Sequence, residues 1–179
     1  KVVTVPNFQN KLFVGIKYGV DGKHVAMSIA TKVDEKIFVE SIDCQSVRNG
    51  NTWIISFLKE ADIEKVVIDG SGSQQILSDE IKDYGIKLKP VLPKVSDVVV
   101  ANNMFEQAVT SSKNICHNDQ PSLKQIVTNC KRRAIGTNGG FGFKAMMEEH
   151  EIALLDSVIL AHWACATYKG VKKKQKISC

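Results

Sequence analysis

The order in which hydrophobic spacing changes along the chain is the strongest constraint on its fold. Over residues 12–20, apolar side chains occupy every second position, which is the period of a β-strand with one apolar face. Asp21 and Gly22 then form a turn signal, and two further strand-like runs cover residues 24–31 and 36–44. Three consecutive runs of this kind, separated by short turns, predict three antiparallel strands at the start of the domain.

After residue 50 the spacing alternates between the 3.6-residue period of a helix and short apolar runs typical of buried strands. Gly85 is suited to the C′ position of one helix and Ser96 to the N-cap of the next. Four glycines within 136–142 predict a flexible loop or hairpin tip. The predicted helices are 52–61, 74–84, 97–111, 121–131 and 149–168, and the predicted strands between them are 66–69 and 86–92.

Three antiparallel strands followed by helix, strand, helix, strand and further helices predict an α/β fold with a mixed five-stranded sheet and helices on both faces. This order is the ribonuclease H-like topology, in which the first strand lies beside the fourth. A chain of 179 residues with 44% hydrophobic content fits one domain. We expect that domain to cover residues 1–168 and to be followed by a flexible, lysine-rich tail over 169–179.

The net charge of +5 comes from the tail rather than from the domain. Five of the 24 basic residues follow residue 168 and no acid follows Asp156, so residues 1–168 contain 19 basic and 19 acidic residues. A lysine tail is more often a solvated end than a DNA-binding groove, although DNA contact stays open. Five scattered cysteines without a Cys-x-x-Cys pair favour a reducing, cytoplasmic setting, and no apolar run approaches the ~20 residues that cross a bilayer.

Two carboxylates interrupt apolar segments far apart in the sequence. Asp69 ends the run 66–68, and Asp156 lies within the run 154–161. An unpaired buried carboxylate costs several kcal/mol, so acids in such segments indicate a partner such as a divalent cation, unless each is simply a surface acid at the margin of its element. The strand order and the packing of the final helix predict that both acids converge. Mg²⁺ and Mn²⁺ choose oxygen ligands, and two such ions about 3.5–4 Å apart can promote in-line phosphodiester hydrolysis.

Four stretches of the sequence form a pattern: GIKYGVDGKHVAMSIA (15–30), VVIDG (66–70), LPKVSDVVVANNMFEQAV (92–109) and RRAIGTNGGFGFKAMMEEHEIALLDSVILAHWA (132–164). Together they resemble the C-terminal nuclease domain of bacteriophage terminase large subunits. The resemblance implies Mg²⁺- or Mn²⁺-dependent endonucleolytic cutting of concatemeric viral DNA, with Asp69 and Asp156 as catalytic metal ligands. It also implies double-stranded DNA, the terminase ATPase domain, the small terminase and the portal as partners, in the cytoplasm of a bacterial host.

The first strand departs from the family pattern, because Lys17 stands where the family has an aspartate. The nearest acid, Asp21, is a candidate third metal ligand and catalytic residue only if the chain bends at Gly19 and Gly22, since four strand residues span about 13 Å. Lys17 itself could contact the scissile phosphate, or it could fill the place of one metal ion. The basic residues that we expect to hold DNA phosphates are Lys17, Lys94, Arg132 and Arg133.

Other functions stay open at the level of sequence. Glu148, Glu149 and Glu151 suit a charged helix start, or they could add to a metal's ligands. Junction resolvases and transposases share the predicted fold, and a module whose site has decayed could keep a DNA-binding or assembly role in the packaging motor. The sequence contains no ATP-binding loop motif, so we expect no motor activity from it.

Overall fold

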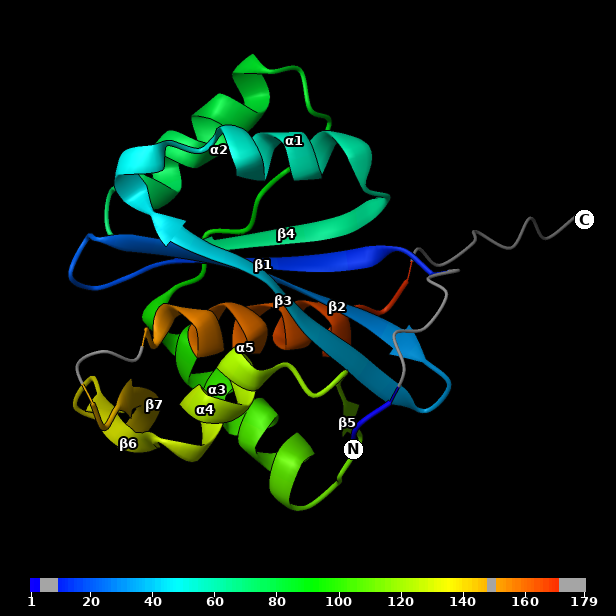
Figure 1. Ribbon diagram of the computed structural model, residues 1–179, viewed down its shortest axis with the longest axis vertical. Helices are drawn as coiled ribbons and strands as arrows, with labels where there is room; N and C mark the ends of the chain where they lie inside the picture. Colours follow the sequence, from blue (N-terminus) through cyan, green and yellow to red (C-terminus); the bar gives the residue numbers. More distant parts are fainter. Residues whose placement is uncertain (4–9, 148–150, 171–179) are drawn as a thin grey trace, which may run out of the picture.

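A central sheet covered by helices on both faces forms the molecule, as seen in the computed structural model, which describes residues 1–3, 10–147 and 151–170 (Figure 1). One face carries α1 (Thr52–Glu60) and α2 (Ser73–Asp83). The other face carries α5 (Ala153–Ala166), with α3 (Val95–Thr110) and α4 (Pro121–Thr128) outside it. None of the helices in the described part of the chain combines the length and the apolar character needed to cross a membrane.

The sheet has the strand order β4-β1-β2-β3-β5. Strands β1 (Leu12–Tyr18), β2 (His24–Val33) and β3 (Lys36–Ser46) form an antiparallel meander, and β4 (Ile63–Asp69) lies parallel to β1. At the other edge, β5 (Ile115–Cys116) runs parallel to β3. The predicted mixed sheet of five strands, with the first strand beside the fourth, is therefore confirmed.

The fifth strand is not the one that the sequence predicts. Residues 86–92 form no regular strand, and only Val91 bridges to the sheet, accepting from the Ile68 N–H at 2.9 Å and donating to the Val66 carbonyl at 2.8 Å. Pro90 and Pro93 on either side of Val91 have no N–H to donate, so they prevent a longer ladder. The prediction of a strand at 86–92 is thus wrong, and the two-residue strand β5 takes the fifth place.

Both faces of β1 are buried, not one alone. Its even-numbered residues pack under α1 and α2, while Phe13 belongs to the cluster around α5. A Cβ atom on Gly15 would lie 2.1 Å from the Ser157 carbonyl oxygen and 2.5 Å from the Ala161 nitrogen. Only glycine therefore allows α5 to cross β1 this closely.

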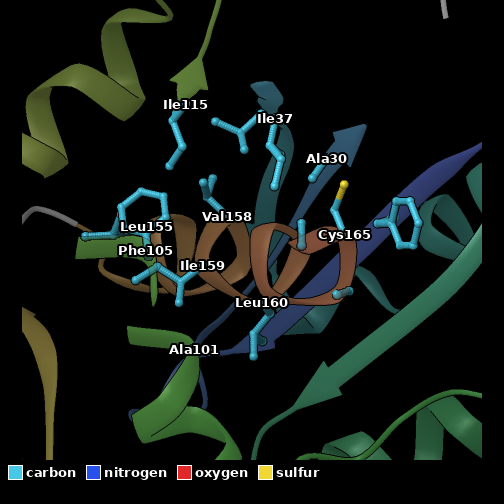
Figure 2. Close-up of a cluster of buried hydrophobic side chains, with 14 of the residues drawn as sticks. Ala30, Ile37, Ala101, Phe105, Ile115, Leu155, Val158, Ile159, Leu160 and Cys165 are labelled. Carbon is cyan, nitrogen blue, oxygen red and sulfur yellow. The ribbon is translucent and has the colours of Figure 1, made fainter. Parts of the chain in front are cut away.

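Helix α5 is apolar on nearly all sides, which is typical of a helix buried in a core. Its side chains meet the sheet on one side and α3 on the other, as Figure 2 shows for Leu155, Val158 and Ile159 with Ile37 of β3 and Phe105 of α3. The described helix begins at Ala153, later than the predicted residue 149. This packing fixes the position of α5 on the sheet, and with it the position of Asp156 in the first turn of the helix.

A two-stranded hairpin, β6 (Cys130–Ile135) and β7 (Gly140–Ala145), lies next to α3 at the end of the molecule where α5 begins (Figure 1). The predicted glycine-rich hairpin tip is confirmed at 136–139, where Gly136 and Gly139 have positive φ. Gly85 likewise follows α2 with a φ of 71°. The predicted N-cap of α3 is wrong: Lys94, not Ser96, holds that position, and its N–H donates to Asp97 Oδ2 at 2.9 Å.

Candidate functional site

The candidate site begins with an ion pair between two neighbouring strands. Lys17 of β1 and Asp69 of β4 are direct partners in the parallel register, and both lie on the face of the sheet that α5 covers. The Lys17 ammonium donates to Asp69 Oδ2. Their side chains are only 11% and 19% exposed, so little water screens this charge pair.

Asp156 joins this pair from the first turn of α5. A cavity of about 20 Å³, enough for about one water molecule, is lined by Lys17, Asp69, Asp156, Asn102 and Arg133 among others. The two acids that the sequence singles out are 87 positions apart, and the fold places both at the same small cavity. The sequence-predicted convergence of Asp69 and Asp156 is thus what the structure shows.

The Asp156 carboxyl group is held in surroundings that disfavour its charge. Burial raises its pKa from 3.8 to about 6, even though Lys17 and Arg133 act to lower it, and the negative charges of Asp69 and Glu151 raise it further. Among the described residues, its carboxylate oxygens take part in no hydrogen bond or ion pair. A carboxylate in this state gains stability from any cation that reaches it.

Asn102 of α3 is a residue of the site that sequence reasoning missed. Its side chain is 2% exposed, and its Nδ2 donates to the Val98 carbonyl at 2.8 Å. Asn102 lines the cavity, and its Oδ1 is buried and has no hydrogen-bond partner within the described residues. The sequence did carry a signal for Asn102, which is an amide on an otherwise apolar helix face. Buried polar groups are nearly always paired, so an amide at a core position indicates a polar partner.

The predicted phosphate-binding residues divide into two groups. Lys17 and Arg133 line the cavity, and Arg133 Nε is held by the Phe143 carbonyl at 3.2 Å. Arg132 points to the other face of the hairpin, where its Nε donates to Glu106 Oε1 at 2.8 Å. Lys94 at the start of α3 does not line the cavity either.

Asp21 is also absent from the cavity lining. It lies in the turn between β1 and β2, where its carboxylate is grouped with His24 and Glu151. Glu148 and Glu149, the other acids considered as additional ligands, lie outside the described residues. The structure therefore brings two of the three predicted metal-binding acids together and places Asp21 in a neighbouring group.

Comparison with known proteins gives a clear structural answer. No protein-family model matches the chain, and no curated protein sequence matches it. Among solved structures, the large terminase nuclease of the thermophilic phage G20c with bound magnesium superimposes with a TM-score of 0.62 at 15% identity, covering 90% of this chain and 85% of that one. The nuclease domain of the large terminase from bacteriophage SPP1, with bound manganese, gives 0.53 at 13% identity, covering 90% and 92%.

The large terminase of bacteriophage HK97 gives a TM-score of 0.63 at 13% identity, covering 87% of this chain. The chain spans 40% of the length of that protein. The matches thus include isolated nuclease domains as well as a longer terminase. They show that this chain has the ribonuclease H-like fold of phage large-terminase nuclease domains.

Proposed function

We propose that this chain is a divalent-metal-dependent DNA endonuclease, the nuclease domain of a phage DNA-packaging terminase that cuts concatemeric double-stranded DNA. The observation that supports this most is the meeting of Asp69 and Asp156 in one small cavity beside two basic side chains. Oxygen ligands with cationic groups next to them suit a phosphodiester substrate and a hard cation. The fold shared with terminase nucleases favours this function over other enzymatic functions.

The residues at the cavity fit a bound Mg²⁺ or Mn²⁺. Asp69, Asp156 and the unpaired Oδ1 of Asn102 offer oxygen atoms from three different elements, and oxygen is the donor that both ions prefer. Related nuclease structures contain magnesium, cobalt and manganese. When bound, one such ion would stabilise negative charge on a reacting oxygen of the phosphodiester. A pair of ions would stabilise both the attacking and the leaving oxygen.

The protein's own groups position the substrate. Arg133 is fixed by its bond to the Phe143 carbonyl and can hold a phosphate oxygen at the cavity mouth. Asp156 has little freedom to move, because α5 crosses β1 at Gly15 with no space to spare. In this proposal Lys94, Arg132 and the lysine tail act farther along the DNA, holding its backbone without reading sequence.

Lys17 supports a second candidate function. Its ammonium already neutralises Asp69, so it occupies a position where a cation would otherwise bind. If that ion pair persists with DNA present, the chain would act as a DNA-binding or assembly module of the packaging motor instead of as a nuclease. If Lys17 transfers to the scissile phosphate, Asp69 becomes free for a metal ion.

Incubation of supercoiled plasmid with the protein and Mn²⁺ or Mg²⁺ tests the nuclease proposal. We expect nicked and linear products, and their loss in Asp69→Asn and in Asp156→Asn. Asp62→Asn is the matched control, because Asp62 is an exposed acid directly before the other end of the same strand β4. Intact plasmid across both metals, together with calorimetry in which Asp69→Asn and Asp156→Asn leave Mn²⁺ binding unchanged, would favour the binding module.

The same assay separates the related enzyme classes. A terminase nuclease should cut plain duplex DNA, whereas a junction resolvase or transposase should prefer branched or terminal-repeat substrates. The ATPase domain, the small terminase and the portal are the partners that this proposal implies, and co-purification with a phage ATPase domain would test the first of them.

A further inference from the structure

The turn between β1 and β2 carries a group of metal-binding side chains that the nuclease proposal does not use. Asp21, His24 and Glu151 each offer a ligand atom, and these atoms lie within 4.8 Å of one another. Two of the residues come from the turn and from the start of β2, and the third comes from the segment directly before α5. Figure 1 shows this turn at the end of the sheet where α5 begins.

His24 and Glu151 lie as close together as an ion pair, but they do not form an aligned hydrogen bond. His24 Nδ1 lies 2.8 Å from Glu151 Oε2. Yet the nitrogen, which is screened from solvent, is not aligned for a hydrogen bond with any partner in the described residues. Two ligands of one cation at bond lengths of about 2.1 Å are separated by about 3 Å, and neither points directly at the other. The distance between these two atoms is therefore close to that between neighbouring ligands of one cation.

The two carboxylates of the group are held in place by the backbone. Asp21 Oδ1 accepts from the Lys23 N–H at 3.0 Å, and Glu151 Oε1 accepts from the Ala153 N–H at 3.4 Å. Each acid thus keeps a second oxygen that the backbone does not use. A Cβ on Gly19 would lie 3.0 Å from Asp21 Oδ1 and 3.3 Å from Glu151 Oε1, so both negative groups approach the same glycine.

Charge gives this group a reason to bind a cation. No lysine or arginine in the described chain forms a salt bridge with Asp21 or Glu151, and the only basic partner is the His24 imidazole. Glu151 also acts electrostatically on Asp156, so the group lies close to the nuclease cavity while remaining outside its lining. A divalent cation would relieve the repulsion between the two carboxylates.

We propose that Asp21, His24 and Glu151 form a separate divalent-cation site that joins the β1–β2 turn to the start of α5. One imidazole nitrogen with two carboxylate oxygens suits a first-row transition metal such as Mn²⁺, Co²⁺ or Zn²⁺ better than Mg²⁺, which prefers oxygen ligands alone. The site does not depend on the nuclease proposal, because it shares no ligand with the cavity of Asp69 and Asp156.

Electron paramagnetic resonance of Mn²⁺ bound to the full chain, in excess Mg²⁺, tests this assignment. Mg²⁺ occupies sites made of oxygen alone, and Mn²⁺ has little affinity for the free cysteines. We expect one bound Mn²⁺ whose pulsed spectrum shows coupling to an imidazole nitrogen. His24→Ala should remove that coupling and weaken binding by about tenfold or more, and Glu151→Gln should weaken binding similarly. His117→Ala, at a histidine on the far edge of the sheet, is the matched control and should change neither.

Two results would overturn the proposal. One is nitrogen coupling and affinity that are unchanged in His24→Ala. The other is loss of the Mn²⁺ signal in Asp69→Asn but not in His24→Ala, which would place the ion in the nuclease cavity. In the second case the nuclease proposal would stand and the separate site would fail. Retained Mn²⁺ binding in Asp69→Asn, with loss of plasmid cutting, would support both.

Discussion

Replacement of Asp156 by asparagine is expected to stabilise the metal-free protein at neutral pH. The folded structure raises the pKa of this carboxyl group from 3.8 to about 6, chiefly by burial. Between these two values the folded state holds a proton that the unfolded chain has released, so the free energy of unfolding falls as the pH rises. Above pH 6 the full cost of the charged, unpartnered carboxylate is present. Asparagine is close in shape and carries no charge.

The size of the effect follows from the two pKa values. A pKa of about 6 in the folded protein against 3.8 in the unfolded chain corresponds to about 3 kcal/mol of destabilisation above pH 6. Part of that will be recovered by relaxation and water entry, so we expect Asp156→Asn to gain on the order of 2 kcal/mol at pH 7.5. At pH 4 most of this gain should be lost, and below about pH 3, where the carboxyl group is protonated in both states, it should vanish.

Urea unfolding of wild type and variant at pH 4 and pH 7.5, with EDTA present, measures this difference directly. Comparison at each pH removes the contribution of every other titrating group. Addition of Mn²⁺ at pH 7.5 should then stabilise wild type more than the variant, because only wild type keeps both acidic ligands.

Two outcomes would refute this reasoning. If Asp156→Asn lowers stability at pH 7.5 without metal, the carboxylate has a favourable partner that outweighs its burial. If the difference between variant and wild type is the same at both pH values, the pKa of Asp156 is not raised. Asp62→Asn, at an exposed acid, should show no comparable gain.

Three further predictions concern the packing and the charges around the site. His162→Met should stabilise the protein by up to about 3 kcal/mol near pH 4 and by little at pH 7.5. Burial lowers the His162 pKa from 6.5 to about 4, so the unfolded chain binds the proton first as the pH falls. Urea unfolding at both pH values measures this difference, and an equal gain at each pH would contradict the prediction. Gly15→Ala should lower the free energy of unfolding by about 2 kcal/mol or more, since its Cβ would lie 2.1 Å from the Ser157 carbonyl oxygen; a thermal midpoint equal to that of wild type would refute the close crossing. Lys17→Ala should strengthen, by about tenfold in calorimetry, the Mn²⁺ binding that Asp69→Asn removes, because Asp69 loses its competing ammonium. Weaker binding there would show that the ion pair does not oppose the metal.

Local spacing in the sequence was enough to predict most of the fold. The three antiparallel strands, the strand leading to Asp69 and the helix carrying Asp156 each have a periodic pattern that depends only on near neighbours. The edge strand β5 was not predicted, because two residues are too few to show any period. The strand predicted at 86–92 does not form, because its apolar residues suit a strand but prolines interrupt its hydrogen bonds.

The candidate site was predicted in part. Asp69 and Asp156 stood out because each is a charge in an apolar run, and that contrast is visible in the sequence. Asn102 did not stand out, because an amide on an apolar helix face is a weaker contrast than a charge, and only the fold shows that its Oδ1 is buried without a partner among the described residues. The grouping of Asp21 with His24 and Glu151 was likewise not visible, since the third residue lies more than a hundred positions away.

The sequence alone determined most of the strands and helices and which two acids are set into them, since these depend on side-chain order along the backbone. The tertiary structure alone decided which of those groups touch. The close crossing of α5 over β1 at Gly15 brings Asp156 to the ion pair of Lys17 and Asp69, and it also sets Glu151 beside the β1–β2 turn. Contacts of this kind depend on how separate elements pack in space, and no local pattern of residues records that packing.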